Sequence, residues 1–214
     1  MLSEENEKLI GYMKKLGYLK SKNLEDALRA VPRELFIPKG LKELAYVDSP
    51  LSIGHGQTIS QPSTVVLMTE MLRLRKGQKV LEIGSGSGWQ AALIANIVKE
   101  KVYTVEKVFE LVYLAKKNLR QARIKNVVVI HGDGSHGLKQ HAPYDKIIVT
   151  AAMPTVAEPL LEQLKVGGRL VGPVGNVYMQ KMVIVDKTGK NSFHQKELEG
   201  WFAFVPLLGT YGFK

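Results

Sequence analysis

The stretch Val80-Leu81-Glu82-Ile83-Gly84-Ser85-Gly86-Ser87-Gly88-Trp89 decides the fold of this 214-residue chain. Its first residues predict a buried strand, three alternating glycines follow, and the apolar pattern of residues 89–98 predicts a helix that begins at once. Glycine allows a sharp turn and a close approach of a ligand to the main chain. The free N–H groups at the start of the helix then favour a polar or anionic ligand. A tight turn without a ligand is the alternative interpretation.

The spacing of the glycines excludes three common loops. A dinucleotide-binding loop requires Gly-x-Gly-x-x-Gly, but Trp89 stands at the last position. No Gly-Lys-Ser/Thr follows, which excludes a P-loop, and Ser85 stands where a nucleophile elbow needs glycine. The remaining pattern, an acidic residue two positions before three alternating glycines, resembles the loop of class I S-adenosylmethionine-dependent methyltransferases.

Outward from this loop, short apolar strands alternate with amphipathic helices. Strands are predicted over 79–83, 102–105, 127–130, 146–150 and 169–173, with helices over 89–98, 109–121 and 156–164. This alternation predicts an α/β fold with a doubly wound, mostly parallel sheet, as in Rossmann-like methyltransferases. The chain before it carries predicted helices over 3–16, 23–30 and 63–74, and the region 38–62 has no clean period.

The C-terminal part follows a different pattern. Residues 181–185, 193–198 and 201–205 predict strands, and Lys187-Thr188-Gly189-Lys190 is a hairpin signal. We interpret Trp201, Phe202 and Phe204 as core-facing strand residues. We therefore expect a single methyltransferase domain over 1–214. Its parts are N-terminal helices with a substrate-side loop (1–60), a cofactor-binding core (61–175) and C-terminal antiparallel strands that complete the sheet and the substrate cleft (176–214).

Acidic residues follow two further predicted strands. Glu106 closes the second strand of the alternation, where a carboxylate can accept both hydroxyls of a ribose. Asp133, in Gly132-Asp133-Gly134, follows the third strand, where it can accept an adenine amino proton. A helix N-terminal acid and a plain Asp-Gly turn are the respective alternatives. Three such marks at successive strand ends favour a nucleoside-bearing cofactor.

The end of the fourth strand bears on the methyl acceptor. It is Thr150-Ala151-Ala152-Met153-Pro154, which offers no side-chain carbonyl to a nitrogen nucleophile. Enzymes that methylate base amines usually carry Asn/Asp-Pro-Pro-aromatic there. Small neutral residues suit an acceptor that is already nucleophilic at pH 7, and a carboxylate is one, because its pKa is about 4.

Segments along nearly the whole chain resemble the protein-L-isoaspartate (D-aspartate) O-methyltransferase family. The most specific is Gly56-Gln57-Thr58-Ile59-Ser60-Gln61-Pro62. The others, beside the Gly-rich loop, are Val31-Pro32-Arg33-Glu34-Leu35-Phe36, Tyr144-Asp145-Lys146-Ile147-Ile148-Val149-Thr150-Ala151-Ala152, Leu164-Lys165-Val166-Gly167-Gly168-Arg169-Leu170 and Phe204-Val205-Pro206-Leu207.

This resemblance implies methyl transfer from S-adenosyl-L-methionine to the α-carboxyl of L-isoaspartyl residues, and in some members to D-aspartyl carboxyls, with S-adenosyl-L-homocysteine as product. The ester then reopens the succinimide route to normal aspartate. Carried over by position, Ser60 is the catalytic and substrate-binding serine. The cofactor-binding residues are Gln57, Thr58, Ile59, Gly84, Ser85, Gly86, Gly88, Glu106, Asp133 and Gly134, and the other substrate-binding residues are Ala151, Val205, Pro206 and Leu207.

The sequence departs from the family in two places. Some members have Ala-Pro-His after the serine, where this chain has Gln61-Pro62-Ser63, and no histidine stands at Val65. The final segment, 208–214, is short, which puts its part in closing the site in doubt. The implied mechanism needs no general base, since an ionised carboxylate attacks the methyl group in line. Ser60 would then orient the carboxylate, or shape the cleft through its backbone, and is not a covalent nucleophile.

Composition limits the remaining classes. The chain is 45% hydrophobic and 23% charged and has no cysteine, which is typical of a globular protein and excludes disulfides and thiolate metal sites. The five histidines lack metal-ligand spacing, so we expect no metal. No signal peptide or membrane span is predicted, so we expect a cytoplasmic monomer whose partners are isoaspartyl proteins and peptides, with no membrane partner.

The net charge of +10 keeps two alternatives open. Its excess is concentrated in residues 51–150, where Lys116, Arg120 and Arg123 share one helix face. A solvated helix face explains this pattern, and we expect no nucleic-acid partner. An RNA methyltransferase is the alternative enzyme, and a non-catalytic cofactor-binding or nucleic-acid-binding module is the alternative from another class.

Overall fold

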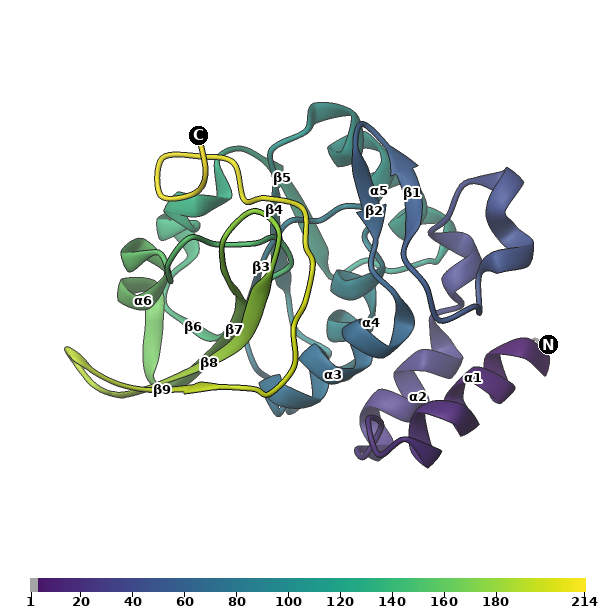
Figure 1. Ribbon diagram of the computed structural model, residues 1–214, viewed down its shortest axis with the longest axis horizontal. Helices are drawn as coiled ribbons and strands as arrows, with labels where there is room; N and C mark the ends of the chain where they lie inside the picture. The colour runs from purple at the N-terminus through teal and green to yellow at the C-terminus, as the bar shows by residue number, and fades with distance from the viewer. Residues whose placement is uncertain (1–3) are drawn as a thin grey trace.

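A seven-stranded sheet forms the centre of the structure, a computed structural model that describes residues 4–214 (Figure 1). In spatial order its strands are β5 (Val127–His131), β4 (Val102–Glu106), β3 (Val80–Ile83), β6 (Tyr144–Val149), β7 (Leu164–Gly175), β8 (Gln180–Gly189) and β9 (Ser192–Glu197). The first five are parallel, and β8 and β9 are antiparallel to their neighbours. This topology confirms the predicted α/β fold with antiparallel C-terminal strands.

Helices cover both faces of the sheet, which explains why β3 is an unbroken buried run. One core cluster joins the sheet to α3 (Pro62–Leu72), α4 (Trp89–Val98) and α5 (Phe109–Gln121). A second cluster, on Tyr144, Leu160 and Leu170, includes α6 (Glu158–Gln163). Short 3₁₀ helices η3 (Gly134–His136) and η4 (Lys139–His141) follow β5. The predicted helices over 89–98 and 109–121 are confirmed to the residue.

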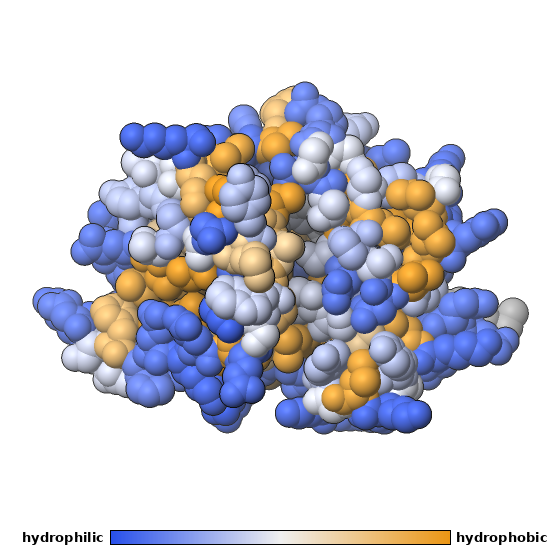
Figure 2. All heavy atoms as spheres, in the orientation of Figure 1, coloured by the Kyte–Doolittle hydropathy of each residue, from blue (hydrophilic) through white to orange (hydrophobic). Residues whose placement is uncertain are grey.

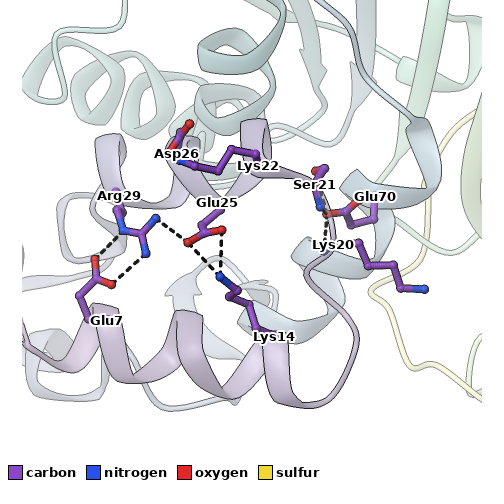
Figure 3. Close-up of polar contacts among 9 residues, drawn as sticks. All are labelled: Glu7, Lys14, Lys20, Ser21, Lys22, Glu25, Asp26, Arg29 and Glu70. Atoms are coloured by element: carbon purple, nitrogen blue, oxygen red, sulfur yellow. Dashed lines mark hydrogen bonds and ion pairs between the residues drawn. The ribbon is translucent and has the colours of Figure 1, made fainter.

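The N-terminal helices α1 (Glu4–Lys15) and α2 (Lys22–Ala30) add their apolar faces to the first cluster. Figure 3 shows the ion pairs between them: Arg29 of α2 bridges Glu7 of α1 and Glu25, which also accepts from Lys14. A separate contact fixes the residues just before α2 to α3, because Glu70 Oε1 accepts from the backbone N–H groups of Lys20 and Ser21. The predicted helix start at Ser3 lies outside the described residues.

The region 38–62 is more regular than its sequence suggested. It contains a 3₁₀ helix, η2 (Lys39–Leu44), and an antiparallel hairpin of β1 (Leu51–Gly54) and β2 (Gln57–Ile59). Another 3₁₀ helix, η1 (Arg33–Leu35), precedes the region. Leu51 and Ile53 are buried and alternate with exposed residues. Strands of four and three residues are too short for this alternation to be detected from sequence.

The prediction of a strand over 201–205 was wrong. This segment joins the sheet only through isolated bridges, one of which pairs Phe202 with Gln180. Trp201 is 62% exposed, so it is not a core residue, and Phe202 and Phe204 are only partly buried. The yellow C-terminal chain crosses the face of Figure 1 and ends near η3, beside the carboxyl ends of the parallel strands. Within residues 4–214, no helix is long and apolar enough to cross a membrane.

Candidate active site

Three adjoining cavities lie where β3, β4 and β6 end, the edge at which open α/β sheets bind ligands. The central cavity, of about 80 Å³, is lined by the predicted residues Gln57, Thr58, Gly84, Gly86, Glu106, Gly134, Ala151, Val205, Pro206 and Leu207. The loop cavity, of about 50 Å³, is lined by Thr58, Ile59, Ser60 and residues of the Gly-rich loop, Ser85 among them. The outer cavity, of about 290 Å³, contains Ser60 and Trp201 in its wall. In Figure 2 the middle of this face carries apolar and weakly polar residues, while hydrophilic ones dominate its periphery.

The Gly-rich loop is held by a residue that the sequence analysis missed. Thr150 Oγ1 lies 2.7 Å from the carbonyl oxygen of Gly84 and 3.0 Å from that of Ile83. A Cβ at Gly84 would lie 2.5 Å from this hydroxyl, and Gly84 also has a φ of +95°, so only glycine fits. Thr150 lines all three cavities. Its position at the end of the fourth predicted strand was the available signal.

Glu106 lies where a ribose-binding carboxylate was predicted. Its Oε2 accepts from the N–H of Gly86 at 2.9 Å, and its Oε1 accepts from the N–H of Val108 at 3.0 Å. These bonds fix the carboxylate against the Gly-rich loop at the wall of the central cavity. Each oxygen keeps a further lone pair, so the carboxylate can still accept two hydroxyl groups.

Glu82, two residues before the first glycine, is fully buried behind the loop. Its Oε2 accepts from the hydroxyl of Thr104, which in turn lies 2.7 Å from Ser85 Oγ. Burial raises the pKa of Glu82 to about 8, with a smaller contribution from Glu106. The Glu82 carboxyl is therefore mostly neutral at pH 7. It lines none of the three cavities, so its role is to support the loop through Thr104 and Ser85.

The predicted residues Asp133 and Gly88 do not line these cavities. Gly88 has a φ of +89° and lies against Ala115 of α5, so helix packing requires this glycine. Asp133 is bound by the C-terminal segment: Oδ2 accepts from the N–H of Thr210 at 2.9 Å and from its hydroxyl at 3.2 Å. Oδ1 accepts from the N–H and hydroxyl of Ser135. Because a carboxylate has about four acceptor positions, an adenine amino group would have to displace one of these donors.

These bonds also determine the charge of Asp133. Burial raises its pKa, but the hydrogen bonds from Ser135 and Thr210 outweigh burial and lower the pKa to about 2. The carboxylate is therefore ionised at neutral pH. The short C-terminal segment, whose role in closing the site was in doubt, covers it directly.

Ser60 lies at the boundary between the loop cavity and the outer cavity. Within residues 4–214, the Ser60 hydroxyl makes no hydrogen bond, so it is available to a ligand. The Ser60 carbonyl oxygen accepts from Arg33 Nη2 at 2.9 Å. Among residues 4–214, no imidazole or carboxylate is bonded to this hydroxyl, so Ser60 is not arranged as a covalent nucleophile.

The other predicted features lie elsewhere. The described residues contain no group of three or more His, Asp or Glu that could hold a metal ion. Lys116, Arg120 and Arg123 line a separate open groove at the sheet edge, together with Val127 and its neighbours on β5. This groove is not part of the three cavities.

Comparison with known proteins identifies the family. The model of the protein-L-isoaspartate(D-aspartate) O-methyltransferase family matches residues 4–212, nearly the whole chain. The chain belongs to this family. It is therefore a class I S-adenosylmethionine-dependent enzyme whose activity is protein-L-isoaspartate O-methylation, a step of protein repair, as the sequence predicted.

Curated relatives and solved structures agree with this assignment. The chain is 48% identical to protein-L-isoaspartate O-methyltransferase of Methanopyrus kandleri, over 97% of this chain and 93% of the relative. It is 47% identical to the Pyrococcus horikoshii enzyme of the same name, over 100% and 97%. A solved protein-L-isoaspartate O-methyltransferase shares 34% identity and a TM-score of 0.85, over 97% of this chain and 67% of that one.

A more distant solved structure supports the fold. It is a putative protein-L-isoaspartate O-methyltransferase from Plasmodium falciparum in complex with S-adenosyl-L-homocysteine. It is 24% identical, with a TM-score of 0.83, over 96% of this chain and 99% of that one.

Proposed function

We propose that the central and loop cavities hold S-adenosyl-L-methionine and that the acceptor carboxylate enters through the outer cavity to Ser60. The supporting observation is the position of the Ser60 hydroxyl, which makes no hydrogen bond within residues 4–214 and lies between the Gly-rich loop and the larger outer cavity. The acceptor is the α-carboxyl of an L-isoaspartyl residue in an aged protein. S-Adenosylmethionine, when bound, supplies an electrophilic methyl group.

The residues present fit this cofactor in most respects. Glu106 offers two fixed oxygens to the ribose hydroxyls, with Gly84, Ser85, Gly86 and Gly134 around it. Gln57, Thr58 and Ile59 contribute further lining of the two cavities. Asp133 is assigned to the adenine amino group once Thr210 moves away. Gly88 serves the cofactor indirectly, by setting the start of α4.

The chain supplies position rather than acid–base chemistry. A carboxylate with its ordinary pKa is already ionised at pH 7 and needs no base. The Ser60 hydroxyl donates to one acceptor oxygen and leaves the other aligned with the methyl group. Ala151 and the segment Val205–Leu207 exclude water from this contact, which strengthens the attraction between carboxylate and sulfonium. We infer a single methyltransferase domain over 1–214, whose parts meet at about residues 60 and 175, and a monomer.

The deciding experiment is methyl transfer from labelled S-adenosylmethionine to matched isoaspartyl and aspartyl peptides. We expect label in the isoaspartyl peptide alone, and a D-aspartyl peptide tests the second activity. Cofactor binding without label would support a non-catalytic module. A steep salt dependence of RNA affinity, lost on charge reversal at Arg120 and Arg123, would support the RNA alternative.

A further inference from the structure

The outer cavity has two chemically different walls. Ser60, Gln61 and Thr64 form a polar wall, and Trp201, Phe202 and Phe204 form an aromatic wall. Because both walls line one cavity, a peptide that presents its isoaspartyl carboxylate to Ser60 can place a neighbouring residue against the aromatic wall. Nothing in the family activity specifies what that residue should be.

Trp201 is the exposed part of the aromatic wall. Its side chain is 62% exposed although the ring is large and mostly apolar. The Lys181 ammonium lies 3.9 Å from the centroid of the Trp201 ring and covers one of its faces. This contact restrains the ring, and the exposed remainder of Trp201 lines the outer cavity.

The backbone of the aromatic wall is fixed by one buried residue. Gln180 is fully buried, and its backbone exchanges two hydrogen bonds of 2.9 Å with Phe202. Its Oε1 also accepts from the N–H of Phe204 at 2.8 Å. These bonds hold the wall in place although it has no strand pairing along its length. A binding surface that is preformed needs such a fixed backbone.

We propose that Trp201 forms a subsite for the side chain next to the isoaspartyl residue and selects an aromatic side chain there. Stacked or edge-to-face aromatic contacts contribute about 0.5–1.5 kcal/mol beyond the burial of apolar area. Wild-type kcat/KM should then be about 2–10-fold higher for an aromatic-flanked peptide than for an alanine-flanked one. This inference rests on the proposed acceptor path through the outer cavity.

The test compares isoaspartyl peptides that carry Phe or Ala on either side of the isoaspartyl residue. The measured quantity is the ratio of their kcat/KM values in wild type, Trp201→Ala, Trp201→Phe and Tyr113→Ala. Tyr113 is a matched control, because it is 71% exposed on α5 and lines none of the three cavities. We expect the preference to disappear in Trp201→Ala, to persist in Trp201→Phe and to be unchanged in Tyr113→Ala. A ratio near one in wild type, or a preference retained in Trp201→Ala, overturns the subsite.

Fluorescence separates this subsite from the proposed function. The chain has two tryptophans, and Trp89 is buried, so Trp201→Phe gives the background emission. With S-adenosylhomocysteine bound, the Phe-flanked peptide should change the emission of Trp201 more than the Ala-flanked peptide does. If the Phe-flanked peptide causes the larger emission change but neither peptide is methylated, the subsite is retained and the proposed acceptor chemistry is rejected. Equal or absent changes with both peptides would reject the subsite even where both are methylated.

Discussion

Arg33 Nη2 donates a hydrogen bond of 2.9 Å to the carbonyl oxygen of Ser60, which links residues that are 27 positions apart. Arg33 is almost completely buried, and its Nη1 donates to the carbonyl of Ala45 at 2.7 Å. Its guanidinium carbon also lies 5.2 Å from the centroid of the Trp89 ring, at the start of α4. One buried side chain thus connects the Ser60 segment to the helix that follows the Gly-rich loop.

Replacement of Arg33 should destabilise the fold and impair catalysis together. Burial lowers the pKa of Arg33 to about 10, so the group is still charged at neutral pH. Arg33→Met leaves buried carbonyl oxygens unpaired but also removes a desolvated charge, so we expect a loss of about 2–4 kcal/mol in unfolding free energy. The unfolding free energy of Arg33→Lys should lie between those of wild type and Arg33→Met, because a single ammonium cannot reach all the carbonyls. Denaturant unfolding measures the effect, and a loss below about 0.5 kcal/mol in Arg33→Met contradicts it.

Ser60→Ala should slow turnover far more than it weakens cofactor binding. Loss of one orienting hydrogen bond predicts a fall in kcat of about 10–100-fold on an isoaspartyl peptide. The dissociation constant of S-adenosylhomocysteine, measured by calorimetry, should stay nearly constant. Ser192→Ala, on the exposed strand β9, is the matched control. Equal losses in turnover and cofactor binding would reject the orienting role of Ser60.

The sequence predicts the centre of this fold well because its signals there are local. Three signals are contiguous in sequence: the strand before Gly84, the glycines and the helix from Trp89. The strand and the helix are both largely apolar runs, which can be recognised without knowledge of distant residues. Glu106 follows from the same logic, since it ends the neighbouring parallel strand. The Gly-rich loop and the carboxylate beside it are therefore determined by short, contiguous segments of sequence.

The features that sequence analysis missed depend on contacts between distant residues. Arg33 belongs to a residue type that is seldom buried, so its position behind Ser60 could not be anticipated. Thr210 donates a hydrogen bond to Asp133, which lies 77 positions earlier in the chain. No local sequence pattern predicts that these two residues are in contact. Trp201 stands in an apolar-looking segment whose backbone bonds to Gln180, at the start of β8, form only an isolated bridge and no continuous strand pairing. Burial there is decided by tertiary packing.

The buried carboxyl of Glu82 should make stability depend on pH. Its pKa is about 8 in the fold against an ordinary value of 4.5. Between these values the folded state holds a proton that the unfolded state has lost, so stability falls as pH rises. Glu82→Gln keeps a neutral group beside Thr104 and removes this dependence. The unfolding free energy of wild type should therefore decrease relative to Glu82→Gln by at most about 1.4 kcal/mol per pH unit from pH 5 to 8. A difference that is constant with pH would contradict a neutral Glu82.

The C-terminal segment should compete with the cofactor for Asp133. Gly209 has a φ of +155°, and a Cβ there would lie 2.1 Å from Asp133 Oδ1, so Gly209→Ala must displace the segment. The central cavity, of about 80 Å³, is also smaller than typical ligand pockets of about 300–1,000 Å³, so part of its wall has to move on binding. Release of the two bonds from Thr210 should strengthen S-adenosylhomocysteine binding by about 2–10-fold and speed its association.

Gly200→Ala provides the matched control for this prediction. Gly200 also has a positive φ, of +98°, but no atom lies within 4 Å of a Cβ built there. It therefore reproduces the backbone strain of an alanine substitution without the clash against Asp133. Calorimetry and stopped-flow binding of S-adenosylhomocysteine to both variants measure the difference. Weaker binding in Gly209→Ala than in Gly200→Ala would mean that the segment forms part of the cofactor site, because its displacement would then remove favourable contacts instead of a competitor.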